Sequence, residues 1–217
     1  MSKLKLYHYW RSGSSWRVRW VFAVKKVDCE YIPVSLLNGE SESPEHLKRN
    51  PLGYVPVLEL PDPANSGKSR FLSESLAIME WCDETYAGPS ILSTDPYSRA
   101  KIRSLSEIIN SDTQPLQNLG TQARHSDDKD EQKKWVQYWI RNGLHAYEKL
   151  VEETAGKYSV GDELTMADIC LVPQCYAAER YFIDVAEYPT ITRIRQMAMK
   201  SEGYRLSEPE RFKPADA

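Results

Sequence analysis

Strand-like segments occur only in the first third of this 217-residue chain, and this distribution restricts the folds open to it. In that third, short apolar runs that alternate like strands are interleaved with amphipathic helical segments. We predict strands at residues 4–9, 29–34, 57–60 and 70–72, and helices at residues 15–26, 44–49 and 74–86. A strand–helix–strand opening followed by a hairpin and a closing helix predicts a mixed four-stranded sheet with helices on its faces.

The remainder of the chain has helical periodicity. Helices are predicted at residues 97–124, at residues 131–154, and from about residues 166 and 190. Pro115 is expected to kink the first of them, and the polar tail with Pro209 and Pro214 is expected to lie on the surface or fray. The fold class is therefore α/β plus all-α. We divide it into an α/β domain at residues 1–86, a linker at 87–97 and an all-helical bundle domain at 98–217.

Composition excludes several classes of function. The formal net charge of −3 gives no basic surface for nucleic acid. No apolar run reaches the roughly 18 residues that span a bilayer, and no secretion signal precedes the first strand, so we expect a cytoplasmic protein without membrane contact. The scattered histidines give no support for a metal site. Because they lack CxxC spacing, the four cysteines are predicted to be buried free thiols: Cys29, Cys82, Cys170 and Cys175.

The turn between the first strand and the first helix is rich in small hydroxyl side chains, with the sequence RSGSSWRVR at residues 11–19. Such hydroxyls can simply cap the helix, by accepting hydrogen bonds from the free amides of its first turn. The same position also suits an anion such as a thiolate, because the free amides and the helix dipole favour negative charge. The residues alone leave both interpretations open.

Two further segments can be interpreted in two ways. If the Val55–Pro56 peptide is cis, Val55 can present its amide and carbonyl to an extended peptide, although an ordinary trans turn proline is commoner. Glu74 and Ser75 begin a helix, where an acid and a hydroxyl can serve as caps. The same pair can instead bind the ammonium and carboxylate of an amino-acid end, such as the γ-glutamyl end of glutathione.

Thr165 and Asp168 have the spacing of a capping box at the start of the helix predicted from residue 166. Thr165 is the expected N-cap, and the carboxylate of Asp168 can accept the main-chain amide of Thr165. We interpret Asp168 as a buried folding signal and not as a catalytic acid.

Together these segments resemble the cytosolic glutathione transferases, and more narrowly their zeta class, also called the maleylacetoacetate isomerases. The resemblance runs from about residue 4 to about residue 200. It is strongest in WRVR at 16–19, the NP and VP turn at 50–56, QPLQNL at 114–119 and VGDELTMADICLVPQ at 160–174. It implies a thioredoxin-like first domain, a helical second domain, a homodimer, and glutathione as cosubstrate.

The resemblance also implies roles for individual residues. The hydroxyl of Ser12 would hydrogen-bond the glutathione sulfur, and Val55 would pair with the peptide beside a cis-proline. Arg180 would hold a carboxylate of a small dicarboxylic or electrophilic acid. Apart from the resemblance, Arg11 can either bind a substrate carboxylate in the same way or be a solvated arginine of the turn. Four further residues would complete the glutathione site: Glu74, Ser75, Gln114 and Asn118.

The chain departs from the family pattern at three positions in these segments. Gly13 stands where a second serine is usual, and Glu74 stands where the zeta class usually has glutamine. Ser14 stands where a cysteine is usual, which disfavours a thiol-assisted step and a mixed disulfide. Ser14 can still donate a second hydrogen bond to the sulfur, but without a base it is a poor nucleophile. The hairpin connection near residues 64–69 is longer than the family norm.

The resemblance therefore predicts an enzyme, a glutathione-dependent cis–trans isomerase of maleylacetoacetate-like dicarbonyl acids in aromatic amino acid catabolism. Two alternatives remain open. One is a glutathione transferase that uses the same site to conjugate or dehalogenate small electrophilic acids. The other is a noncatalytic binding protein that keeps the fold for contact with a partner.

Overall fold

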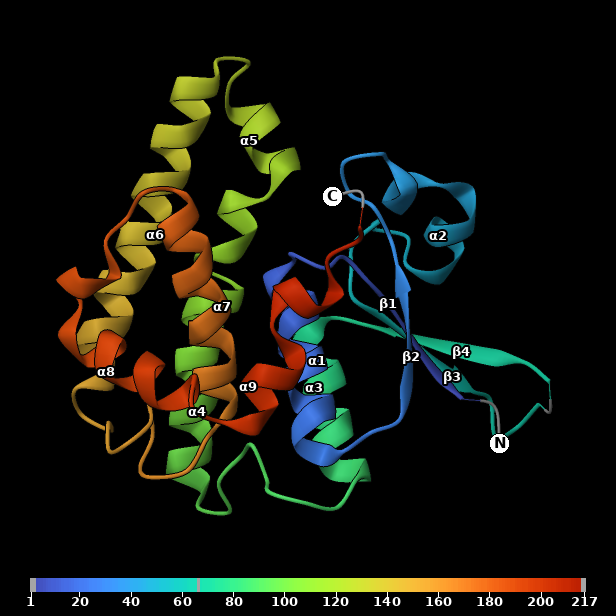
Figure 1. Cartoon of the computed structure of the whole chain (residues 1–217), viewed down its shortest axis with the longest axis horizontal. Helices are drawn as coiled ribbons and strands as arrows, with labels where there is room; N and C mark the ends of the chain where they lie inside the picture. Colours follow the sequence, from blue (N-terminus) through green and yellow to red (C-terminus); the bar gives the residue numbers. More distant parts are fainter. Residues whose placement is uncertain (1–2, 66, 216–217) are drawn as a thin grey trace. The chain divides into compact units, whose positions relative to one another are not determined.

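The computed structural model describes residues 3–65 and 67–215 (Figure 1). These residues divide into two compact units, and the first combines the described residues up to Pro89 with those from Glu202 onward. The second unit spans Ser90–Ser201. The end of the chain therefore belongs to the first unit, which differs from the predicted assignment of residues 98–217 to one helical domain.

A mixed four-stranded sheet forms the centre of the first unit. Its strands are β1 (Leu4–His8), β2 (Cys29–Pro33), β3 (Val57–Pro61) and β4 (Ser69–Ser73). The strand order is β2-β1-β3-β4, with β1 parallel to β2 and β3 antiparallel to both of its neighbours. This topology confirms the predicted strand–helix–strand opening and hairpin.

Helices cover both faces of the sheet. The first unit contains α1 (Gly13–Lys25), α2 (Pro44–Arg49), α3 (Ser75–Thr85) and α9 (Glu202–Ser207). Neighbouring residues of a strand point to opposite faces, so His8 and Tyr7 of β1 identify what covers each one. His8 contacts Arg19 of α1, and α3 packs beside α1. Tyr7 faces α2, where the guanidinium of Arg49 lies 4.1 Å from the centre of its ring.

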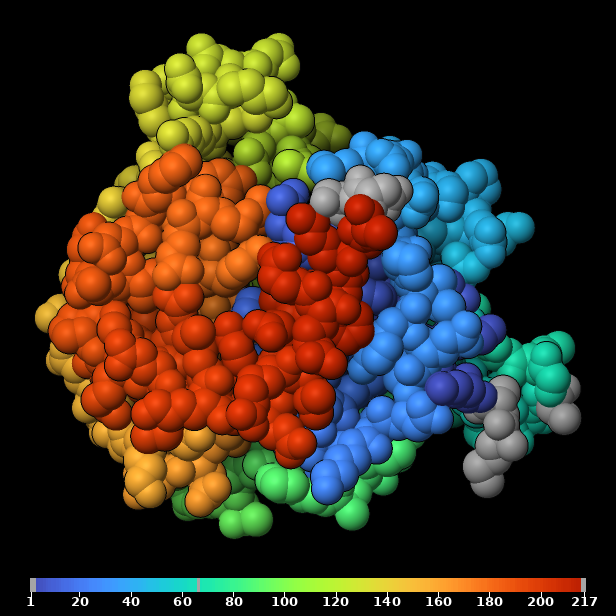
Figure 2. Space-filling view, viewed as in Figure 1, coloured from blue at the N-terminus to red at the C-terminus, as the bar shows by residue number. Residues whose placement is uncertain are grey.

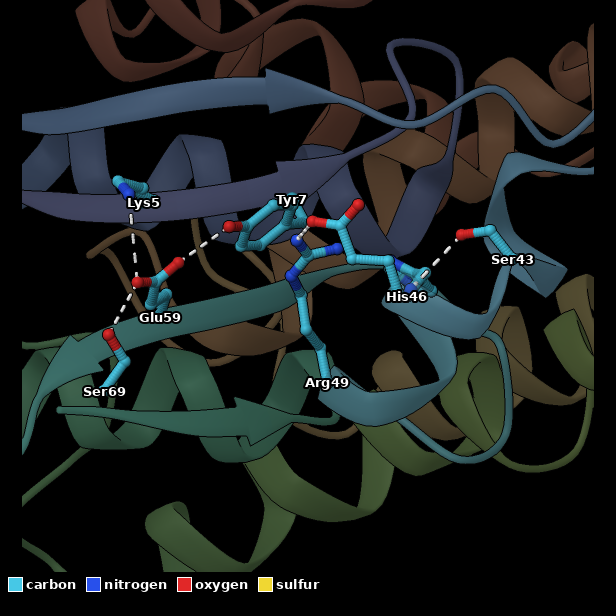
Figure 3. Close-up of polar contacts among 8 residues, drawn as sticks. Lys5, Tyr7, Ser43, His46, Arg49, Glu59 and Ser69 are labelled. Carbon is cyan, nitrogen blue, oxygen red and sulfur yellow. Dashed lines mark hydrogen bonds and ion pairs between the residues drawn. The ribbon is translucent and has the colours of Figure 1, made fainter.

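A chain of polar contacts crosses the face of the sheet that α2 covers (Figure 3). The carboxylate of Glu59 accepts the hydroxyl of Tyr7 at 2.7 Å and that of Ser69 at 2.6 Å. The Nζ of Lys5 lies 3.8 Å from the same carboxylate, and the guanidinium of Arg49 lies over the ring of Tyr7. These contacts join three strands to α2 and hold this short helix against the sheet.

The tail after Pro209 lies largely on the surface, which was one of the two predicted alternatives, and it does not fray, since a short 3-10 helix forms at Pro209–Phe212. The helix α9 that precedes the tail is packed on α1. Tyr204 of α9 lies with its ring centre 5.6 Å from that of Trp16 and 5.4 Å from that of Trp20. Ser207 at the end of α9 is fully buried. The polar sequence of α9 concealed this packing, because its partners on α1 lie nearly 200 residues away.

The second unit is helical. It contains α4 (Pro96–Asn110), α5 (Leu119–His125), α6 (Lys129–Val151), α7 (Met166–Arg180) and α8 (Pro189–Ala198). Buried residues line almost the whole of α7, which forms the core of the unit. None of the helices in the described part of the chain is long and apolar enough to cross a membrane.

The predicted kinked helix at residues 97–124 is two helices with a break between them. The first ends at Asn110, a short 3-10 turn follows at Gln114–Gln117, and the second begins at Leu119. Pro115 lies at the start of the 3-10 turn. A proline has no amide donor, so it is better accommodated at the beginning of a turn than inside a helix.

Candidate active site

Ser12 is the N-cap of α1, which confirms the capping interpretation. Its Oγ accepts the main-chain N–H of Ser15 at 3.2 Å, and its own N–H donates to the carbonyl of Tyr9 at 3.1 Å. The cap uses the Ser12 oxygen as an acceptor, so the hydroxyl hydrogen can still be donated to an anion. Capping and anion binding are therefore compatible at this residue.

The first turn of α1 suits an anion. All residues of this turn lie within the described ranges, and none of them is acidic. No side chain of the turn therefore neutralises the positive end of the helix dipole. Ser12 and Ser14 are half-buried, whereas Ser15 is buried and accepts the main-chain N–H of Tyr9 at 3.4 Å. A ligand at this turn would meet Ser12 and Ser14.

Val55 is joined to Pro56 by a cis peptide bond, the less common of the two alternatives considered from the residues. Within residues 3–65 and 67–215, the main-chain N–H and C=O of Val55 form no hydrogen bond. An extended peptide can therefore pair with both groups as an added strand would.

The carbonyl of Tyr54, next to Val55, is held by side chains from α2 and its end. His46 Nε2 and Asn50 Nδ2 each lie 3.1 Å from this carbonyl oxygen. Because a carbonyl only accepts, the proton of His46 is assigned to Nε2. Sequence reasoning missed both residues, since it treated the Asn50-Pro51 dipeptide only as part of a turn.

Glu74 and Ser75 begin α3 in an unusual way. Glu74 has a φ of 69°, in the left-handed region that a non-glycine residue rarely adopts. Its side chain is exposed and makes no capping hydrogen bond, so the capping interpretation was wrong for this residue. Backbone strain of this kind, about 1–3 kcal/mol, is concentrated at functional sites.

Ser75 is buried and is contacted from α1. Arg17 Nη1 donates to the Oγ of Ser75 at 3.3 Å, and Arg17 is itself buried. As at Ser12, the hydroxyl oxygen is used as an acceptor and the hydroxyl hydrogen remains to be donated. Arg17 thus connects the beginnings of α1 and α3. Sequence reasoning noted Arg17 only as part of the WRVR motif and gave it no role.

Three predicted site residues lie in the second unit. Gln114 is half-buried at the beginning of the 3-10 turn, and Asn118 is exposed at its end. The main-chain amide of Asn118 donates to the carbonyl of Pro115 at 3.4 Å, which closes the turn that carries both residues. Arg180 is the last residue of α7 and is exposed.

Arg11 and a cavity adjoin the Ser12 turn in the first unit. The guanidinium of Arg11 is half-buried and lies 5.3 Å from the centre of the Trp10 ring. Trp10 and Tyr9 line a cavity of about 370 Å³, with further walls from the segment at residues 33–40 and from Pro214. The turn that carries Ser12 therefore borders a space that can hold a small molecule.

The cysteines of the chain are unsuited to act as nucleophiles here. All four are buried free thiols, as predicted. Burial raises the pKa of Cys29 and of Cys82 in the first unit to about 12, so neither is ionised near neutral pH. Among the residues that the structure describes, no group of His, Cys, Asp or Glu is placed to hold a metal ion.

Two family models match the sequence. The model of the glutathione S-transferase N-terminal domain matches residues 2–84. The model of the glutathione S-transferase C-terminal domain matches residues 114–201. The two matches together cover most of the chain.

Relatives match along nearly the whole chain. The maleylacetoacetate isomerase of Mus musculus is 41% identical over 208 residues, which cover 95% of this chain and 92% of the relative. A crystal structure of maleylacetoacetate isomerase from Anaeromyxobacter dehalogenans, with glutathione bound in its active site, is 38% identical with a TM-score of 0.88. The match covers 99% of this chain and 98% of that one. Another structure of that protein, with the same TM-score of 0.88, holds dicarboxyethyl glutathione and citrate in its active site.

Proposed function

The chain belongs to the glutathione S-transferase family, in the branch of the maleylacetoacetate isomerases, and from this premise we propose that it is a glutathione-dependent cis–trans isomerase. Its substrates are maleylacetoacetate-like dicarbonyl acids, which belong to aromatic amino acid catabolism. The observation that supports this most strongly is that one unit contains three complementary groups. The first is the hydroxyl of Ser12 at the start of α1, whose first turn carries no acidic side chain. The others are the main-chain N–H and C=O of Val55, which form no hydrogen bond among the described residues, and the exposed carboxylate of Glu74 before Ser75.

The residues of the first unit fit glutathione. The free N–H and C=O of Val55 match the main chain of the central cysteinyl residue. The hydroxyl of Ser75 and the free amides of α3 would bind the γ-glutamyl carboxylate. The exposed carboxylate of Glu74 would bind its ammonium group. Gln114 and Asn118 of the second unit would complete the site, as the family resemblance implies.

Ser12 and the start of α1 would keep the glutathione sulfur ionised. When bound, glutathione supplies a thiolate that adds reversibly to the activated cis double bond, so that rotation and release give the trans isomer. A thiol with an ordinary pKa of about 8.5 is only about 3% ionised at pH 7, and lowering its pKa by two units requires about 2.7 kcal/mol. A hydrogen bond to a charged acceptor contributes about 1.5–3 kcal/mol and a helix dipole about 0.3–1 kcal/mol, so the required amount lies within what the two together can supply.

Two arginines would hold the acid substrate. Arg180 and Arg11 can each form paired hydrogen bonds with a carboxylate, which orients a dicarboxylic acid as well as neutralising it. Ser14 would donate a second hydrogen bond to the sulfur. Because this position carries a hydroxyl and not a thiol, the chain's own residues there bind and orient, and form no covalent bond.

We also place the working enzyme in the cytoplasm as a homodimer. The family resemblance supports both statements. Sedimentation of the purified protein would test the dimer, and fractionation of cells would test the location.

The test of the proposed function is turnover of a cis-dicarbonyl acid with and without glutathione, measured beside conjugation of haloacids. We expect isomerisation that requires glutathione and that exceeds conjugation. Conjugation without isomerisation would replace this proposal by the transferase alternative. Failure to bind glutathione in a calorimetric titration would favour a noncatalytic binding protein.

A further inference from the structure

Arg19 is a buried cation of the first unit with a complete set of partners. Only 1% of its surface is exposed. Its Nε donates to the carbonyl of Ser207 at 3.1 Å, and its Nη2 donates to the carbonyl of Trp10 at 2.9 Å. Its Nη1 lies 3.5 Å from the carbonyl of Tyr9 and 3.1 Å from Nδ1 of His8. All three nitrogens of the guanidinium are therefore in use.

Two of these partners belong to the turn that carries Ser12. The carbonyl of Tyr9 accepts the main-chain N–H of Ser12 at 3.1 Å as well as Nη1 of Arg19 at 3.5 Å. The guanidinium of Arg19 and the main chain of Ser12 thus share one acceptor. Arg19 holds this turn from inside the fold, through the carbonyls of both Tyr9 and Trp10.

The other contacts come from the end of the chain. Besides the Ser207 carbonyl, the ring of Phe212 has its centre 4.5 Å from the Arg19 guanidinium. The hydroxyl of Ser207 also accepts the indole N–H of Trp16 at 3.1 Å. Figure 1 shows α9 beside α1, and Figure 2 shows the red C-terminal segment covering part of the blue residues of the first unit. Residues 207–212 therefore form one wall of the Arg19 site.

The shape of the guanidinium matters more here than its charge. Within the described ranges no carboxylate pairs with Arg19, whose partners are carbonyls, a ring face and one imidazole. Burial, and then the positive charge of Arg19, lower the pKa of His8 to about 3, so His8 is neutral and its Nδ1 accepts from Arg19. A planar fork reaches these separate acceptors at once, which a lysine ammonium cannot do.

We propose that Arg19 is a positioning residue for the Ser12 turn, and that the C-terminal segment at residues 207–212 sets the geometry of this turn through Arg19. This inference rests on the proposed function, because it concerns the placement of the Ser12 hydroxyl against the glutathione sulfur. It assigns to the end of the chain a role in catalysis that is distinct from contact with substrate.

The experiment compares Arg19→Lys and Phe212→Leu with the wild type and with Phe71→Leu, a matched substitution on β4 away from Arg19. Ionisation of bound glutathione is followed by thiolate absorbance against pH, its Kd by calorimetry, and turnover by kcat and KM. We expect Arg19→Lys to raise the pKa of the bound thiol and to lower kcat about tenfold to a hundredfold, with Kd nearly unchanged. Phe212→Leu should act in the same direction and less strongly, and Phe71→Leu should match the wild type.

Wild-type thiol ionisation and kcat in Arg19→Lys would overturn the inference, because charge without the fork would then suffice. If Arg19→Lys does not fold, as judged by circular dichroism, Phe212→Leu decides, and wild-type behaviour of this variant would equally overturn the inference. A wild type that binds glutathione without ionising it would instead overturn the proposed function, and this inference with it.

Discussion

The main-chain N–H of Ser159 donates to Oδ1 of Asp168 at 2.7 Å inside the second unit. The other carboxylate oxygen accepts the amide of Thr165 at 2.7 Å and its hydroxyl at 2.8 Å. The bonds to Thr165 confirm the predicted capping box. The bond from Ser159 also ties the loop before α7 to Asp168, which the local sequence does not indicate. Asp168 is fully buried, and this burial raises its pKa, while the hydrogen bonds from Ser159 and Thr165 oppose the rise.

Asp168→Asn should lower the free energy of unfolding by about 2–4 kcal/mol, measured by urea denaturation. An amide has one acceptor oxygen, so at least one of the buried donors around Asp168 would lose its partner. Asp128→Asn is the matched control, because Asp128 caps the exposed beginning of α6. Asparagine caps an exposed helix about as well as aspartate, so this variant should stay within about 0.5 kcal/mol of the wild type. Equal effects of the two substitutions would contradict the structural role of Asp168.

Ser12→Ala should reduce kcat about a hundredfold to a thousandfold, the usual effect of removing one donor to a developing or resident anion. It should also raise the pKa of bound glutathione, with the Kd of glutathione changed much less. Loss of the cap will lower stability by about 1 kcal/mol, which a thermal unfolding scan separates from the effect on turnover. Ser14→Ala is the control from the same turn, and its effect on kcat should be the smaller of the two.

Arg180→Met should raise KM for a dicarboxylic substrate about tenfold to a hundredfold, since a hydrogen-bonded charge pair contributes about 1.5–3 kcal/mol. Glutathione Kd should not change, because the proposed glutathione contacts do not include Arg180. Arg124→Met removes another exposed arginine of the second unit and should leave KM unchanged. An unchanged KM in Arg180→Met would leave Arg11 as the candidate for carboxylate binding.

His8 should make stability depend on pH below its ordinary pKa. Burial, followed by the positive charge of Arg19, lowers its pKa from 6.5 to about 3 in the folded chain. Between these two pKa values the unfolded chain binds more protons at His8 than the folded chain does. The contribution of His8 to the free energy of unfolding is therefore complete above pH 6.5 and is lost as the pH falls towards 3. The loss can reach about 1.4 kcal/mol for each pH unit.

Urea denaturation from about pH 8 to about pH 5 tests this dependence. The unfolding free energy of His8→Asn should fall less steeply below pH 6.5 than that of the wild type. His145→Asn removes an exposed imidazole of the second unit and should keep the wild-type slope. Parallel curves for the wild type and His8→Asn would refute a buried neutral histidine.

The sequence predicts features that depend on residues close together in the chain, and not those that depend on distant residues. The strands and most helices were predictable because their periodicity is local, and the Ser12 cap and the Thr165–Asp168 box depend on residues three apart. The division of the chain was only partly predictable. Arg19 and Ser207 lie 188 residues apart, and no local pattern indicates that they meet.

The candidate site shows the same limit. The residues matched by resemblance include Ser12 and Val55, whose local geometry fits the roles proposed for them. The residues that support them were missed: Arg17 behind Ser75, and His46 behind the carbonyl of Tyr54. In the sequence, a side chain that supports a site residue looks like any other residue of a helix. Only its tertiary contact shows what it does.

Gly143 in the middle of α6 gives a last case in which tertiary contact reverses a local expectation. In an isolated helix, alanine is more favourable than glycine by about 0.8–1.0 kcal/mol. Here an added Cβ would lie 1.9 Å from Oγ1 of Thr113, whose hydroxyl donates to the carbonyl of Ile108 at 2.7 Å. Thr113 is fully buried, so it has little room to move away.

Gly143→Ala should therefore destabilise the chain by about 1–3 kcal/mol, the usual effect of overpacking a core, although the intrinsic helix propensity rises. Gly120→Ala in α5 is the matched control, because nothing lies within 4 Å of its added Cβ. This variant should gain up to about 1 kcal/mol. Urea denaturation of both variants measures the two signs. If both alanines stabilised the chain, Thr113 would have to move aside while keeping its hydrogen bond to Ile108. The close approach of Thr113 to α6 would then not be the reason that position 143 is glycine.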